Sequence, residues 1–153
     1  MVRIQMLGAF VIESDGVVYD NLPTRSRRGV NLIQFLILQR GKAVSVSRLN
    51  RELEGGRRSE SPENALKTLV SRTRTMLGEI SRGLGACIVS EKGSYRWEKL
   101  PGVEVDVLLV MEILERLESR PDPETRRQLT EELLKLYKGD VRWTGQPGTS
   151  TPE

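Results

Sequence analysis

The chain has 153 residues, which is enough for one substantial hydrophobic core with a smaller appendage. Its net charge of +3 is unevenly distributed, because residues 1–100 hold 17 Lys and Arg against 10 Asp and Glu, whereas residues 101–153 hold 7 against 11. A basic first part joined to an acidic second part indicates that only the first part meets a polyanion such as a nucleic acid. An accident of composition is the alternative.

Several function classes are disfavoured. The sequence has no histidine, no cluster of metal ligands and no glycine-rich phosphate loop, so an enzyme is the least favoured class and no cofactor is expected. Cys87, the single cysteine, has no histidine to activate it and fits a buried structural role in a reducing cytoplasm. No apolar run approaches the roughly 18 residues of a membrane span, and the alternating start does not resemble a signal peptide.

The chain begins with strand signals. Residues 2–12 alternate with period two, Asp15-Gly16 is a hairpin turn, and Val17–Tyr19 begins a return strand. Asn21–Pro23 is a short third strand or a loop. A small antiparallel sheet is therefore expected at the N-terminus.

A helix is expected next, capped by Thr24, running to about Arg40 and stopped by Gly41. It is apolar on most sides, which is typical of a central core helix. Its first turn carries three cations that the helix dipole disfavours, so either an anionic partner offsets that cost or the turn is merely solvated. These cations are Arg25, Arg27 and Arg28.

Residues 42–45 form an extended link, and Ser47 is expected to cap a brief helix over 48–53. Residues 54–60, EGGRRSE, form a loop. The next helix runs from Ser61, its N-cap, to Gly78, its stop.

The 61–78 helix has two different faces at about 100° per residue. Its apolar arc is Ala65, Leu66, Leu69, Val70, Met76 and Leu77. Its polar arc is Lys67, Thr68, Ser71, Arg72, Arg74 and Thr75.

The polar arc holds no carboxylate after Glu63, whereas solvated helix faces usually mix Glu with Lys. A helix lying in a DNA major groove needs such a face, because phosphate repels acids. An ordinary solvated helix is the alternative. Thr73 falls within the apolar arc, so either its hydroxyl bonds back to a carbonyl of the preceding turn or the packing there is thinner.

After a loop over 80–86, residues 87–89 and 95–97 are expected to form a hairpin around Lys92-Gly93. Residues 100–102 form a boundary. Two helices follow over 105–117, with an apolar stripe at 107, 110, 111, 114 and 117, and over 124–137, with Leu129, Leu133, Leu134 and Leu136 apolar. Such a pair should pack on a neighbour or on further helices.

The order of sheet, three helices and hairpin resembles the OmpR/PhoB-type winged helix. It more closely resembles the DNA-binding and bacterial transcriptional activator domains of the antibiotic regulatory protein (SARP) class. The motifs that carry this resemblance, spread over residues 1–140, are MLGAF with Asp15-Gly16, LPTRSR, VSVSRL, SPENALKTLVSRTRTMLG, SYRW, VEVDV and LYKGD.

The resemblance implies an α+β fold. A winged helix-turn-helix DNA-binding domain, with an N-terminal antiparallel sheet and a C-terminal β-hairpin wing, would span residues 1–99. A partial activator domain, a TPR-like helical hairpin, would span 100–140, and residues 141–153 would be a disordered tail. The resemblance further implies a cytoplasmic activator that assembles on direct repeats of double-stranded DNA, as a homodimer there, and contacts RNA polymerase.

Carried over position by position, the resemblance places Lys67, Thr68, Ser71, Arg72 and Thr75 at base edges and Arg74 at phosphate. Weaker DNA-binding candidates are Lys92 and Arg96 in the wing and Arg25 and Arg27 in the first helix. The loop before the 61–78 helix, with Arg57 and Arg58, would contact the polymerase.

Some positions depart from the family pattern. Glu54 replaces a tryptophan, Ser94 replaces the wing glycine, and Glu91 stands where such wings often place an arginine for the minor groove. The activator domain stops after one helix pair, so the chain is expected to be a fragment or a short member. The rival interpretation is a winged-helix module that binds protein and no longer binds DNA.

Overall fold

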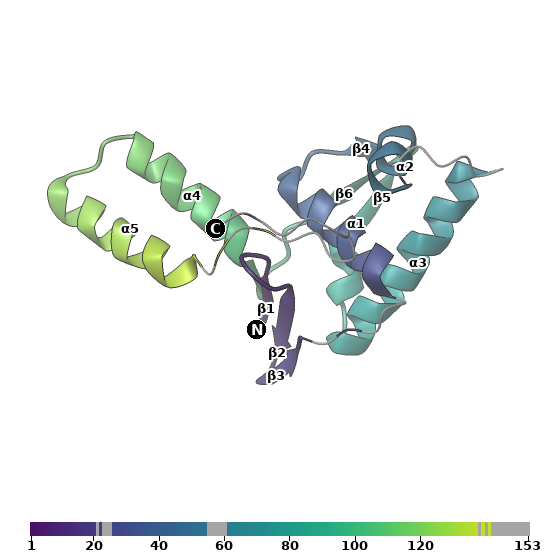
Figure 1. Ribbon diagram of the computed structural model, residues 1–153, viewed down its shortest axis with the longest axis horizontal. Coiled ribbons are helices and arrows are strands. Elements are labelled where there is room, and N and C mark those ends of the chain that lie inside the picture. The colour runs from purple at the N-terminus through teal and green to yellow at the C-terminus, as the bar shows by residue number, and fades with distance from the viewer. Residues whose placement is uncertain (21, 23–25, 55–60, 138, 140, 142–153) are drawn as a thin grey trace. The chain divides into compact units, whose positions relative to one another are not determined.

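The computed structural model describes residues 1–20, 22, 26–54, 61–137, 139 and 141. These residues form an α+β fold with five α-helices and two sheets (Figure 1). The chain divides into two compact units, one built from residues 1–20 and 102–142 and the other from residues 21–101. The functional domains proposed from the sequence follow a different division, because the structure groups the N-terminal strands with the C-terminal helices.

The first unit holds a four-stranded sheet in the order β3-β2-β1-β7. Its strands are β1 (Val2–Gln5), β2 (Val11–Ser14), β3 (Val17–Tyr19) and β7 (Val103–Val105). β1 pairs antiparallel with β2 and parallel with β7. β7 was not expected as a strand, because it pairs with residues about a hundred positions earlier in the chain.

The N-terminal hairpins differ in part from expectation. Asp15 and Gly16 form the expected turn between β2 and β3, both with positive φ, as a type I′ turn requires. The prediction of one strand over residues 2–12 is wrong, because the chain turns at Gly8 (φ 79°) and β2 pairs back on β1. Alternation of apolar residues continues through such a turn, so the pattern alone does not reveal it.

Asp106 joins the end of β1 to α4 (Asp106–Glu118). Its two carboxylate oxygens accept hydrogen bonds from the backbone amides of Met6 (2.7 Å) and Leu7 (3.1 Å). Burial raises the pKa of the Asp106 carboxyl, against the opposing effect of these amides. The carboxylate therefore supplies acceptors to two amides at the end of the strand.

α4 packs on α5 (Pro123–Leu136) and on β1 and β7. The expected apolar stripes are only partly buried. In α4 the buried residues are Val107, Val110 and Ile113, and Leu114 is 45% exposed; in α5 only Leu129 is buried, and Leu134 is 72% exposed. Part of each apolar stripe, at Leu114 and Leu134, therefore stays exposed among the described residues, which agrees with the expectation that the helix pair cannot bury both faces alone.

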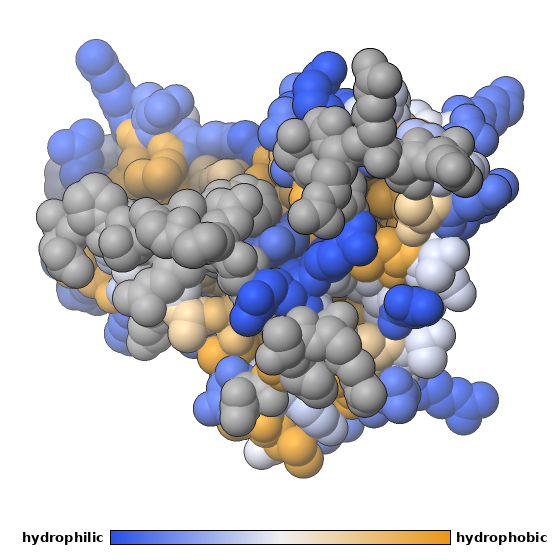
Figure 2. Space-filling model, turned by 45° about the vertical axis from the view of Figure 1, so that its right-hand side comes forward, coloured by the Kyte–Doolittle hydropathy of each residue, from blue (hydrophilic) through white to orange (hydrophobic). Residues whose placement is uncertain are grey.

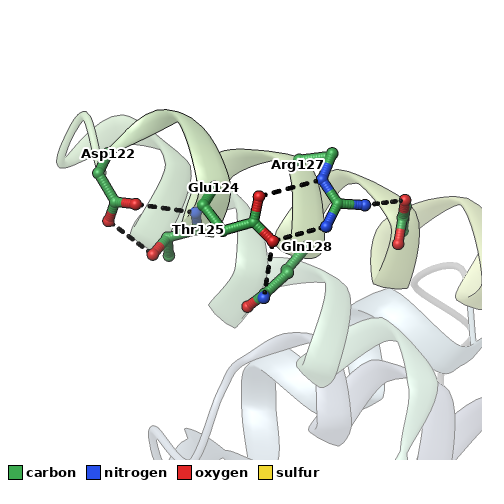
Figure 3. Close-up of polar contacts among 6 residues, drawn as sticks. Asp122, Glu124, Thr125, Arg127 and Gln128 are labelled. Carbon is green, nitrogen blue, oxygen red and sulfur yellow. Dashed lines mark hydrogen bonds and ion pairs between the residues drawn. The ribbon is translucent and has the colours of Figure 1, made fainter.

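The first turns of α5 carry a network of polar side chains (Figure 3). Asp122 accepts hydrogen bonds from the Thr125 amide (3.2 Å) and hydroxyl (2.6 Å), which makes it the N-cap. Arg127 forms ion pairs with Glu124 (2.6 Å) and Glu131 (2.7 Å). These contacts stabilise the helix locally, since three- and four-residue spacings bring such side chains together.

The second unit holds the elements between the two parts of the first. They are α1 (Arg27–Leu38), β4 (Val44–Ser45), α2 (Val46–Glu54), α3 (Pro62–Ile80), the 3₁₀ helix η2 (Leu84–Cys87), β5 (Ile88–Glu91) and β6 (Ser94–Trp97). β4, β6 and β5 form a three-stranded antiparallel sheet in that order. α1 is buried along most of its length, as expected for a core helix.

Several predicted ends are displaced. α1 ends at Leu38, before the expected Arg40, and its expected cap Thr24 lies outside the described residues. Ser45, not Ser47, accepts the capping hydrogen bond from the Arg48 amide at the start of α2 (3.2 Å). Two serines at neighbouring positions cannot be distinguished as caps from the sequence, since either side chain suits the role.

α1 and α3 approach closely at one point. A Cβ atom at Gly29 of α1 would lie 2.7 Å from Oγ1 of Thr73 in α3. The Thr73 hydroxyl donates to the Leu69 carbonyl (2.7 Å), and Thr73 is buried. Of the two explanations for a threonine in the apolar arc, the structure therefore supports the back-bond, and the small residues let the two helices meet.

Candidate nucleic-acid interface

α3 is the helix expected over residues 61–78, and it extends two residues beyond the predicted stop, to Ile80. Ser61 occupies the N-cap position, but its side chain makes no capping hydrogen bond, so the predicted cap was wrong in this respect. Gly78 lies within the helix and does not end it, because Ile80 buries an additional apolar side chain.

The two faces of α3 are present largely as predicted. The buried side is formed by Leu66, Val70, Thr73, Leu77 and Ile80. The exposed side is formed by Asn64, Lys67, Thr68, Ser71, Arg72 and Thr75. We call this exposed set the polar face of α3. Figure 2 brings the side of the second unit that holds α3 toward the viewer, and blue and pale side chains are seen there among smaller orange areas.

Three residues of the expected apolar arc lie at its margin. Ala65 is exposed, and Leu69 and Met76 are only half-buried. The buried side is therefore narrower than the expected apolar arc, and Thr73 lies within it, as the sequence predicted.

Asn64 belongs to the polar face and was missed by the sequence analysis. It lies three, four and seven residues before Lys67, Thr68 and Ser71, which is the spacing of one helix face. Acidic residues border the face, since Glu63 precedes it and the exposed Glu79 lies in the last turn of α3. The stretch from 64 to 78 holds no acid.

Arg74 lies apart from the polar face. It is half-buried, and its guanidinium donates to the Ile88 carbonyl from Nε (3.1 Å) and Nη2 (2.7 Å) and to the Ser90 hydroxyl from Nη2 (2.9 Å). The placement of Arg74 at a phosphate does not fit this geometry, because two of its three nitrogens are directed at β5. A helical wheel gives the direction of the side chain but not the neighbour that it meets.

The β5–β6 hairpin turns at Lys92 (φ 36°) and Gly93 (φ 77°), as expected. Lys92 is exposed at this turn. Arg96 forms ion pairs with Glu91 (2.6 Å) and Glu98 (2.7 Å), and hydrogen bonds to these two carboxylates raise its pKa. The three side chains carry a net charge of −1, so Arg96 adds no net positive charge to the hairpin.

The remaining candidate cations lie on α1 or outside the described residues. Arg27 is exposed at the first turn of α1. Arg25, Arg57 and Arg58 lie outside the described residues.

Cys87 is fully buried at the end of η2, and burial, with a smaller contribution from the charge of Glu98, raises the pKa of its thiol to about 11. A thiol in this state is a poor nucleophile. Within the described ranges, no group of three or more His, Cys, Asp or Glu residues is placed to hold a metal ion. None of the helices described has the length and apolar character needed to cross a bilayer.

Comparisons with known proteins support the fold. No family model matches the chain, and no curated protein matches its sequence. Among solved structures, the chain is similar to EmbR of Mycobacterium tuberculosis, solved in complex with a low-affinity phosphopeptide, with a TM-score of 0.67 and 18% sequence identity. The match covers 92% of this chain and 37% of the EmbR chain, so this chain spans little more than a third of the length of that protein. At this identity, the likeness shows a shared fold.

Proposed function

We propose that this protein is a sequence-specific transcriptional regulator that binds double-stranded DNA through a winged helix-turn-helix formed within residues 1–99. The polar face of α3 carries the proposal. It presents six uncharged or cationic polar side chains, and the opposite side of the helix is buried. Such a helix can enter a major groove without bringing carboxylates toward phosphate.

The side chains of the polar face suit base reading. Arg72 and Lys67 can donate to the acceptors of guanine, and Asn64 has the paired donor and acceptor that adenine matches. Thr68, Ser71 and Thr75 would lie between them with short hydroxyls that reach base edges or phosphates.

Two likenesses support the regulatory part of the proposal. The motifs of the chain resemble the SARP class, and EmbR, whose fold the chain shares, is a regulator of that class. By this analogy residues 100–140 would form a partial activator domain resembling a TPR helix pair, the protein would act in the cytoplasm as an activator, and it would assemble as a homodimer on direct repeats.

The test is DNA binding as a function of salt. A preferred site is first selected from a random DNA pool, and affinity for it is measured by fluorescence anisotropy at several salt concentrations. If about four to six phosphates are neutralised, log affinity should fall with log salt with a slope of about −4 to −5. A flat salt response would refute DNA binding.

We also propose that the segment 54–60 contacts RNA polymerase. Arg57→Ala and Arg58→Ala should then reduce activation in a transcription assay while leaving the DNA gel shift nearly unchanged. Equal losses in the two assays would mean that this segment binds DNA instead.

A winged-helix module that binds protein is the alternative, and one observation favours it. The hairpin cation Arg96 is already paired with Glu91 and Glu98, so this cation would contribute little to DNA binding. If the protein is not retained on DNA even at low salt, this alternative is favoured.

A further inference from the structure

Arg74 links α3 to the β5–β6 hairpin. Its Nε and Nη2 atoms both donate to the carbonyl of Ile88, and Nη2 also donates to the hydroxyl of Ser90. Ile88 is 2% exposed, so its carbonyl lies where few water molecules can replace a lost donor. One side chain of α3 therefore contacts two alternate residues of β5.

The backbone of α3 is held at the same place. A Cβ atom at Gly85, in η2, would lie 2.7 Å from the carbonyl oxygen of Arg74, so η2 packs directly on the α3 backbone there. β5 follows η2 at once. The contact thus combines close backbone packing with a forked side-chain hydrogen bond, and both fix the start of β5 relative to α3.

We infer that Arg74 is a positioning residue that fixes the β5–β6 hairpin on α3, so that the hairpin turn at Lys92 and the polar face of α3 meet DNA in one geometry. Arg74 is then not a phosphate ligand. The functional consequence of this inference rests on the proposed DNA binding, whereas the contact of Arg74 with β5 is a property of the second unit alone.

The chemistry of arginine makes the inference testable. Lysine keeps the positive charge, but its single ammonium group cannot reproduce the planar fork that reaches both Ile88 and Ser90. A phosphate contact made through charge should largely survive Arg74→Lys, whereas a positioning role should not. Ser90→Ala removes one acceptor of the fork without changing any charge.

Backbone amide hydrogen exchange is the first measurement. In Arg74→Lys, exchange of the amides in residues 88–97 should become about tenfold faster, because hydrogen bonds to a charged group are lost. Ser90→Ala should give a smaller increase in the same residues. The matched control is Arg82→Lys, an exposed arginine just after α3, which should leave exchange of the hairpin unchanged.

DNA affinity is the second measurement, made with Arg74→Lys, Lys92→Ala and the double variant. If Arg74 positions the hairpin, Lys92→Ala should cost affinity in the wild-type background and much less in the Arg74→Lys background. The salt slope should be unchanged in Ser90→Ala, although its affinity falls. Additive effects of the two substitutions would overturn the inference.

The outcomes separate the two claims. Wild-type exchange rates in Arg74→Lys would overturn the inference while leaving the DNA proposal standing. If the wild-type protein does not bind DNA, the proposed function fails, and the exchange measurement alone decides whether Arg74 positions the hairpin. Thermal unfolding of each variant identifies any that do not fold; should Arg74→Lys be one, Ser90→Ala decides by the same exchange measurement.

Discussion

The ion pairs of the hairpin predict that DNA affinity can be raised by removing acids. Arg96 lies between Glu91 and Glu98, at 2.6 and 2.7 Å, and the three charges sum to −1. Glu91→Gln brings the sum to zero, and adding Glu98→Gln brings it to +1 and frees the guanidinium. Both glutamates are substantially exposed, so folding should tolerate the changes.

The magnitude follows from counterion release. One additional phosphate contact steepens the salt slope by about 0.9. Between 50 and 200 mM salt, a fourfold change, the double variant should therefore lose affinity by about 3.5-fold more than the wild type does. Glu91→Gln alone should strengthen binding by less, because Glu98 still holds Arg96. The assay is anisotropy on the selected site at a series of salt concentrations.

A matched control removes two carboxylates elsewhere. Glu52 on α2 and Glu132 on α5 are both exposed, and changing both to Gln gives the same change in net charge. The gain should also disappear when Arg96→Ala is added to the double variant. If the control gains as much, or if the gain persists without Arg96, the reasoning about the hairpin is refuted.

Four further outcomes are expected. Arg72→Ala should cost about 1–3 kcal/mol on the preferred site and relax preference at one base pair, measured on single-base variants of that site; a uniform loss on all sites would contradict base reading. Gly→Ala usually stabilises a helix, but Gly29→Ala should destabilise the fold by about 1–3 kcal/mol in chemical denaturation, because the new Cβ would lie 2.7 Å from the Thr73 hydroxyl. Adding Thr73→Ala should remove most of this loss, and additive losses in the double variant would exclude the clash. The Cys87 thiol should resist a thiol reagent at pH 8 and react on unfolding, and rapid labelling of the native protein would contradict its burial. Hydrogen bonds from Thr125 lower the pKa of Asp122, so the contribution of Asp122 to stability should be present above the unfolded pKa of about 4 and be lost as pH falls through the lower folded pKa. The loss of stability in Asp122→Ala, relative to the wild type, should therefore become smaller at low pH, and a loss that does not change with pH would refute the linkage.

Local signals predicted many elements of this chain. Alternation, Asp-Gly and Lys-Gly pairs and helical periodicity were enough to place the short β3 strand, the β5–β6 hairpin and the five helices, because each depends on residues a few positions apart. The polar face of α3 was recognisable for the same reason. Long-range pairing was not accessible, so β7 was missed as the partner of β1.

The amino-acid sequence by itself determined that α3 is amphipathic, with an acid-free side between Glu63 and Glu79. Only the tertiary structure decided which of the candidate cations are engaged by other groups of the protein. Arg72 stays exposed, whereas Arg74 is directed at β5 and Arg96 is paired with Glu91 and Glu98. The reason is physical: helical phase gives the direction in which a side chain leaves its own helix, and the partner that satisfies its hydrogen bonds comes from a segment whose position depends on the packing of the whole unit.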